Sequence, residues 1–205
     1  MKKGLMIGLM GAMTLVACNQ EKEKVEDQFN YTVEQFADLQ LLRFKVHGFE
    51  ELPLKQKELV YYLSEAALQG RDILFDQNGK YNLIIRKMLE VVYTDYQGDR
   101  SDANFKNFET YLKRVWFSNG IHHHYAADKF VPGFTPEFFK SALESVDASK
   151  LPLMEGETLD ALCEEVFPVI FDAKVMAKRV NQADGEDLVL TSASNYYEGV
   201  TQKEA

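Results

Sequence analysis

Apolar residues recur at steps of three and four along most of this chain, and no other feature constrains its fold as strongly. Such spacing gathers them on one face of an α-helix, where they can be buried together. We therefore expect a mainly α-helical protein, with one or two short β-strands near the C-terminus. The expected helices cover residues 32–47, 53–75, 81–96 and 101–116, begin again at Thr135 and Thr158, and end with a short helix over 172–180.

Signals at the ends of these segments refine the prediction. Thr32, Ser101 and Thr158 are placed to accept hydrogen bonds from the first turns of their helices. Pro168 is expected to interrupt the helix that begins at Thr158, because proline lacks the N–H that a helix interior needs. Residues 187–192, DLVLTS, alternate in polarity and form the one convincing strand pattern.

The last five residues, TQKEA, contain a capping-box pattern made by Thr201 and Glu204. A capping box ordinarily opens a helix, and here one residue follows it. We therefore expect the sequence to be cut short relative to longer relatives.

The first eighteen residues, MKKGLMIGLMGAMTLVAC, have the pattern of a bacterial lipoprotein signal. Two lysines precede an apolar run that is too short and too rich in glycine for a good membrane span. Leu15-Val16-Ala17-Cys18 then matches a lipobox, whose cysteine becomes the lipidated N-terminus. The alternative is an ordinary secretory signal with a chance cysteine.

This pattern divides the chain into a signal peptide (1–17), a charged, flexible tether (18–30) and a folded part (31–205). Cys18 is the expected lipidation site, and several acyl chains on one residue would anchor the protein stably to a membrane. Asn19 directly follows the cysteine, as in lipoproteins sent to an outer membrane. We therefore expect a lipid-anchored protein of the bacterial cell envelope.

Charge argues against nucleic-acid binding, and cysteine content argues against a fold held together by disulfides. The 205 residues include 23 basic and 32 acidic side chains, a net charge of −9. Loss of Lys2 and Lys3 with the signal would leave 21 basic against 32 acidic side chains, or −11. Binding of nucleic acid needs a basic surface, so no nucleic-acid partner is expected. The two cysteines, Cys18 and Cys163, do not make a disulfide framework.

The stretch 115–134, VWFSNGIHHHYAADKFVPGF, holds the only tryptophan and three of the four histidines. We expect a long aromatic loop between two helices, and loops of this kind often carry function. Most aromatic residues at helical spacing should be core. Six residues are nevertheless candidates for lining a peptide cleft: Trp116, Phe117, Ser118, Asn119, Tyr125 and Phe130.

The three consecutive histidines, His122, His123 and His124, suggest a metal site only superficially. Neighbouring residues point in different directions, so at most two of the three rings could reach one ion. No H-E-x-x-H motif accompanies them. A structural or surface role is therefore the better expectation, and no metal ligand or catalytic residue is predicted in this chain. Cys163 lies on an apolar stripe and is expected to be a buried, inert thiol.

Several long strings resemble the N-terminal region of bacterial dipeptidyl peptidase III, and the Bacteroides type most closely. They are LKQKELVYYLSEAALQGRDILFDQNGKYNL (54–83), VWFSNGIHHHY, DKFVPGF and KRVNQADGEDLVLTSASNYYEGVT, and the similarity extends from about Asn30 to Ala205. The resemblance implies part of a zinc peptidase that releases dipeptides from peptide N-termini and has two lobes around a cleft. The chain would be the helical N-terminal part of the lower lobe, with 188–190 as an early strand and the 118–134 stretch towards the cleft.

The sequence departs from this family where the chemistry should be. The family's zinc ligands lie on H-E-x-x-G-H and E-E-C-R-A-E-like helices, and neither motif occurs here. We therefore expect a truncated peptidase that is inactive alone, with zinc belonging only to the full-length family. The alternative is a lipid-anchored helical module that binds a peptide or protein partner in its own right. In a third, weaker possibility, a separate chain supplies the missing C-terminal part and the two reassemble.

Overall fold

The computed structural model describes residues 29–205, and its fold is mainly α-helical, which confirms the predicted class. The predicted signal peptide, Cys18 and nearly all of the predicted tether lie outside the described residues. In chain order the elements are β1 (Thr32–Phe36), β2 (Leu39–Leu42), a 3-10 turn (Phe49–Glu51), α1 (Leu54–Gln69), α2 (Arg71–Asn78), α3 (Asn82–Asp95), α4 (Ala103–Ser118), α5 (Pro136–Glu144), a second 3-10 turn (Ala148–Lys150), α6 (Leu159–Phe171) and α7 (Leu188–Thr191). No helix within residues 29–205 is long and apolar enough to cross a membrane.

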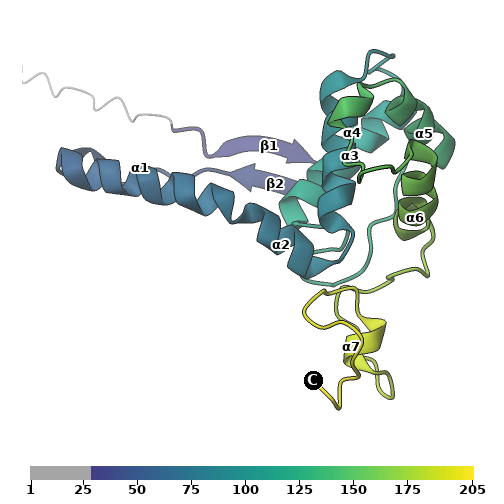
Figure 1. Ribbon diagram of the computed structural model, residues 1–205. Helices are drawn as coiled ribbons and strands as arrows, with labels where there is room; N and C mark the ends of the chain where they lie inside the picture. The colour runs from purple at the N-terminus through teal and green to yellow at the C-terminus, as the bar shows by residue number, and fades with distance from the viewer. Residues whose placement is uncertain (1–28) are drawn as a thin grey trace, which may run out of the picture.

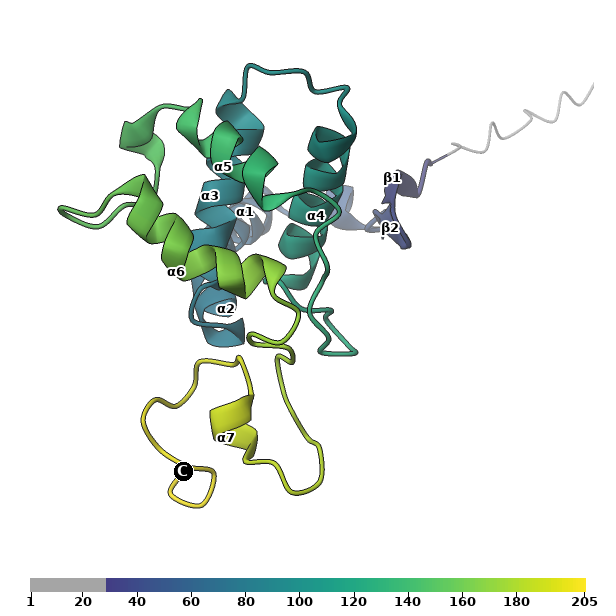
Figure 2. The same ribbon diagram turned by 90° about the vertical axis from the view of Figure 1, so that its right-hand side faces the viewer.

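The core lies where α3, α4, α5 and α6 pack together (Figure 2). On α3 the buried apolar residues are Ile85, Met88, Leu89 and Val92. The stripe predicted from the sequence included Met88 and Val92 but placed Leu83, Ile84 and Val91 in it instead of Ile85 and Leu89, and these three are only partly buried. The neighbouring helices and the segment before α5 contribute a cluster of rings in edge-to-face, tilted and stacked contacts. Members of this cluster include Phe105, Phe108, Phe134, Phe138, Phe139, Phe167 and Phe171.

The caps of these helices follow the sequence closely, with two differences. The side chains of Thr135 and Thr158 accept hydrogen bonds from the first turns of α5 and α6, as predicted. The cap of α4 is Asp102, one residue after the predicted Ser101. Pro168 does not interrupt α6, which continues to Phe171. Its ring is exposed and so is Glu164, so the carbonyl that loses its helical partner can be hydrated instead.

The predicted first helix, 32–47, is wrong. Residues 32–42 form an antiparallel hairpin, in which Phe36 pairs with Leu39 and Thr32 with Leu42 (Figure 1). Ala37 adopts a left-handed conformation with φ 49°, which allows the chain to reverse within two residues. The β-branched and aromatic residues of this segment suit a strand as well as a helix, so pairing between the strands decided the outcome.

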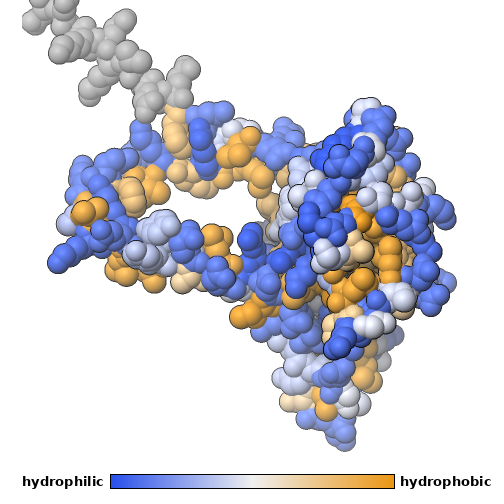
Figure 3. All heavy atoms as spheres, turned by 45° about the horizontal axis from the view of Figure 1, so that its top comes forward, coloured by the Kyte–Doolittle hydropathy of each residue, from blue (hydrophilic) through white to orange (hydrophobic). Residues whose placement is uncertain are grey.

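The predicted second helix, 53–75, is broken at Gly70 into α1 and α2, and its expected burial is also wrong. No residue of α1 is buried, and Leu59, Tyr62, Leu63 and Ala66, expected to face a core, are exposed. Within residues 29–205, α1 makes substantial contact with α2 alone, so it stands away from the helical body (Figure 1). Figure 3 shows an opening framed by α1, the hairpin and the body, with apolar side chains along its sides.

The C-terminal third differs from the prediction in two places. Residues 172–180 do not form the predicted helix. They form turns followed by an extended stretch, in which Lys178 pairs with Asp128 in an isolated β-bridge. The predicted strand 187–192 is the short helix α7, because the Asp187 carboxylate accepts hydrogen bonds from the backbone N–H groups of Val189 and Leu190. An aspartate cap thus outweighed the alternating pattern.

Candidate functional site

The last turn of α4 carries three of the predicted cleft residues. The expected loop therefore begins later, because α4 continues to Ser118 and ends at Asn119, which has a left-handed conformation with φ 52°. Trp116 and Phe117 are each 37 % exposed, whereas Ser118 is buried. The amide of Gly120 donates to the Val115 carbonyl and closes the helix end. Local helix geometry therefore presents two adjacent aromatic rings to solvent.

Trp116 lies between two surface hollows, and we call this surface the Trp116 face. One hollow, of about 380 Å³, is lined by residues of α2 and α3 together with Trp116. The other, of about 260 Å³, is mostly apolar and lies between α4 and the hairpin. The first contains Arg71, Phe75, Arg86, Glu90 and Trp116, and the second contains Glu34, Phe36, Leu41, Lys113, Trp116 and Phe117.

Charged side chains hold the walls of the first hollow in place. The Arg86 guanidinium lies 4.7 Å from the centre of the Phe75 ring, and its Nη1 is 2.8 Å from the Asp72 carboxylate. The indole Nε1 of Trp116 donates a hydrogen bond of 2.8 Å to Glu90, whose Oε1 is also 3.4 Å from Nε of Arg86. Arg86 is 9 % exposed, whereas its partners Asp72 and Glu90 are open to solvent, so a shielded guanidinium is paired with carboxylates at the surface. This network holds the indole ring in one orientation.

Two ion-pair groups attach the hairpin to α4 beside the second hollow. Lys113 contacts Glu34 at 2.7 Å and Glu109 at 3.0 Å, and Arg114 contacts Asp38 at 2.6 Å. The hydrogen bond to Glu34 is the main reason that the pKa of Lys113 is raised above its ordinary value. These contacts position the Phe36 side of the hairpin over Trp116 and Phe117.

The remaining predicted cleft residues do not join this face. Tyr125 is 87 % exposed, and its ring stacks against His124. Phe130 belongs to the core, with the Arg114 guanidinium 5.3 Å from its ring centre. The six candidates therefore do not line one cleft. Only Trp116 and Phe117 lie together in a hollow.

The three histidines have different environments. His122 is buried, and its Nε2 lies 2.7 Å from the Met176 carbonyl, so this nitrogen carries the proton. Burial, followed by the positive charges of Lys129 and Arg179, lowers the pKa of His122. His123 accepts backbone hydrogen bonds at Nδ1 and stacks on His124. Among residues 29–205, no group of three or more His, Cys, Asp or Glu side chains is placed to hold a metal ion.

Burial makes His122 more important than a surface histidine. The sequence led us to expect that changing all three histidines to alanine would alter stability by only about 1 kcal/mol. Loss of the His122 bond would remove the side-chain partner of the partly buried Met176 carbonyl and leave a gap at a buried ring, which adds to the cost. That expected magnitude is therefore revised upward.

Lys129 joins the end of α6 to the residues that follow it, a role that the sequence did not indicate. Its ammonium group donates to the backbone carbonyls of Val169, Asp172 and Val175, which lie at and just after the end of α6. Burial lowers the pKa of Lys129, and the charge of Asp172 opposes this effect. The ammonium group thus supplies a donor to the Val169 carbonyl, in the last turn of α6, where a helix leaves carbonyls without partners. A lysine inside an aromatic stretch gives no sequence signal of this role, because its acceptors are backbone atoms.

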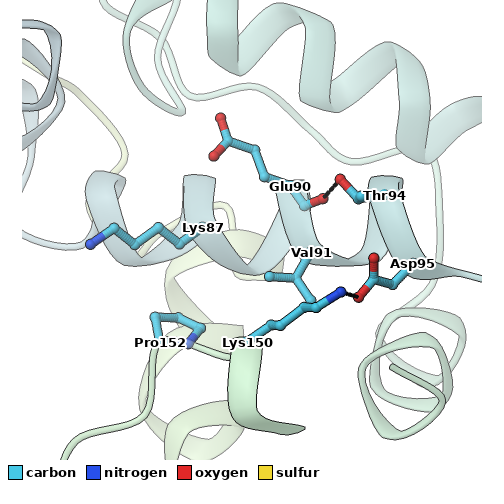
Figure 4. Close-up of a pocket in the computed structure, with 7 residues that line it drawn as sticks. All are labelled: Lys87, Glu90, Val91, Thr94, Asp95, Lys150 and Pro152. Atoms are coloured by element: carbon cyan, nitrogen blue, oxygen red, sulfur yellow. Dashed lines mark hydrogen bonds and ion pairs between the residues drawn. The ribbon is translucent and has the colours of Figure 1, made fainter. Parts of the chain in front are cut away.

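Two further sites are less informative. A groove of about 410 Å³ runs along the outer side of α3, where Lys150 pairs with Asp95 at 2.6 Å (Figure 4). Cys163 on α6 is a buried free thiol, and burial raises its pKa, so little of it is the reactive thiolate.

The chain matches no protein-family model, and no curated protein is significantly similar to it. The described residues therefore carry the functional argument. They offer an uncovered apolar helix and an aromatic, charged face, both of which are suited to binding.

Proposed function

We propose that this chain supplies the helical N-terminal part of the lower lobe of a dipeptidyl peptidase III-type zinc peptidase, and that it does not cleave peptides alone. The long strings that resemble this family support the assignment. The structural observation that carries the proposal is the exposure of apolar side chains along α1. Burying them would take a large surface of further protein.

The apolar residues of α1 surround the helix instead of forming one stripe. Val60, Tyr61, Tyr62 and Leu63 are consecutive, with Leu59 before them, and all five are 45–68 % exposed. Successive residues are about 100° apart on an α-helix, so five of them cover the whole circumference. Charged residues stand on either side of this run, among them Lys57, Glu58 and Glu65, so only the middle of α1 is apolar in every direction. An apolar turn of this kind favours contact with protein on more than one side.

The energy at stake is large for a protein of this size. Covering the exposed part of each of these five side chains would contribute on the order of 1 kcal/mol. The sum is comparable with the total stability of a small domain. A partner with a single contact face would leave much of this surface in water, whereas the remainder of a lobe can enclose it. This favours incorporation into a larger fold.

The alternative is a lipid-anchored module that binds a peptide or protein partner in its own right. It is favoured by the closed core of α3 to α6, which has the packing of an independent domain. Under this alternative, the chain would be soluble and monomeric without the rest of a peptidase.

Reconstitution tests the proposal. Residues 19–205 would be mixed with the separately produced remainder of a Bacteroides-type dipeptidyl peptidase III, and zinc-dependent cleavage of an arginyl-arginyl chromogenic substrate would be measured. We expect neither piece to cleave alone and the mixture to form an active complex. Tyr62→Glu should prevent assembly, whereas Ser64→Glu, on the same helix, should reduce it much less.

Two results would contradict the proposal. One is chelator-sensitive release of the dipeptide by residues 19–205 alone. The other is a folded, monomeric chain that never associates with the remainder, which would favour the independent module.

A further inference from the structure

The first hollow of the Trp116 face, between α2 and α3, has the features of a small-molecule site. Its volume of about 380 Å³ lies within the roughly 300–1,000 Å³ typical of such sites. One wall is the Trp116 ring, and the Phe75 ring with the Arg86 guanidinium on it forms another. Flat, rigid walls of this kind favour a flat ligand group.

Within the described residues, some charged side chains of this hollow have partners and one does not. The Asp72 carboxylate pairs with Arg86, and Glu90 accepts a hydrogen bond from Trp116. Arg71, in contrast, lines the hollow and forms no ion pair or hydrogen bond through its side chain within residues 29–205. The positive charge of Arg71 is therefore the one that a ligand can neutralise.

A second positive charge, that of the Arg86 guanidinium, forms part of the wall of the hollow. Its Nε is shielded from solvent and makes no hydrogen bond within the described part of the chain, although Glu90 Oε1 is 3.4 Å away. A ligand in the hollow therefore meets the charge of Arg86 through space, without a hydrogen bond to Nε.

We propose that this hollow binds an organic anion that carries a flat apolar group, such as an aryl carboxylate. The carboxylate pairs with Arg71, and the ring lies against Trp116. Arginine is the side chain best suited to a planar carboxylate, because its donors form a matching fork. A cation has no free partner in this hollow, since both nearby carboxylates are engaged.

Trp116 is the only tryptophan in the chain, so its fluorescence reports on this hollow directly. The purified chain would be titrated with phenylacetate, its neutral analogue phenylacetamide, and phenethylamine as the cation. We expect a saturable fluorescence change with phenylacetate and binding about tenfold weaker or more with the other two compounds, because each lacks the charged hydrogen bonds.

Variants separate this site from non-specific binding. Arg71→Gln should weaken phenylacetate binding by about tenfold. Lys55→Gln removes the same charge from the exposed surface of α1, outside the hollow, and should leave binding unchanged. The proposal is overturned by equal binding of phenylacetamide or phenethylamine, by undiminished binding in Arg71→Gln, or by no saturable response.

Discussion

Replacing Lys129 with methionine tests the structural role of its partly buried ammonium group. Methionine keeps an unbranched apolar stem of similar length and removes the charged donor. In the wild-type protein that donor contacts the carbonyls of Val169 at 3.0 Å and Val175 at 2.6 Å, and also the Asp172 carbonyl. The substitution therefore removes three contacts while largely preserving the packing.

The expected loss follows from those contacts. A hydrogen bond to a charged group contributes roughly 1.5–3 kcal/mol, so three give a gross value of about 4–9 kcal/mol. Lys129 is only partly buried, so water can replace some of the donors. The variant also avoids burying an ammonium group, which costs free energy. We therefore expect a net loss of about 2–3 kcal/mol in the free energy of unfolding.

Urea denaturation followed by circular dichroism measures this loss, provided that the slope of the transition is unchanged. Hydrogen exchange should increase most at the end of α6 and in residues 172–180, because Lys129 joins these segments. Lys174→Met is the control, since Lys174 is exposed and in the same segment. A loss below about 0.5 kcal/mol in Lys129→Met, the range of ordinary surface substitutions, would refute this reasoning.

Three other predictions concern pH, packing and anchoring. Because the native pKa of His122 is lowered, the unfolded chain takes up this proton first, and stability should fall as pH drops below about 6.5. Urea titrations at several pH values should show a weaker dependence in His122→Gln but not in His47→Gln, and equal slopes for both would disprove this. Leu89→Ala should lower the free energy of unfolding by about 2–5 kcal/mol, because Leu89 is fully buried, whereas Leu59→Ala should lower it by less than about 0.5 kcal/mol. Thermal or urea denaturation measures both, and similar losses would mean that α1 is covered. Cys18→Ser should leave the membrane fraction or retain its signal, and unchanged fractionation and processing would exclude lipidation at this residue.

Local chemistry in the sequence determined the helical body. On α3 the buried positions Met88 and Val92 follow the predicted stripe, because a four-residue step returns to the same helix face. Thr135 and Thr158 cap their helices as predicted, since a cap needs only a side-chain oxygen and the next three backbone N–H groups. These features depend on neighbours within a turn or two, so a single sequence contains the necessary information.

Tertiary structure decided the hairpin, the burial of α1 and the Trp116 face. Residues 32–42 have spacing compatible with a helix, but they pair with one another as two strands, and ion pairs hold this hairpin to Lys113 and Arg114, which lie far along the chain. The spacing of apolar residues in α1 predicts a buried face, yet within residues 29–205 only α2 makes substantial contact with this helix, so its apolar side chains are exposed. Spacing gives the shape of an element, whereas burial depends on what packs against it.

The candidate site divides in the same way. The composition of 115–134 drew attention to Trp116 and Phe117, and both are partly exposed beside hollows. Nothing in the sequence associates Arg86 with Trp116, because they meet only through Glu90 across α3 and α4. The three carbonyls around Lys129 likewise belong to the backbone, which has the same polar groups at every residue. The sequence therefore indicates which residues are chemically suited to a site, and only the packing of the helices brings them together.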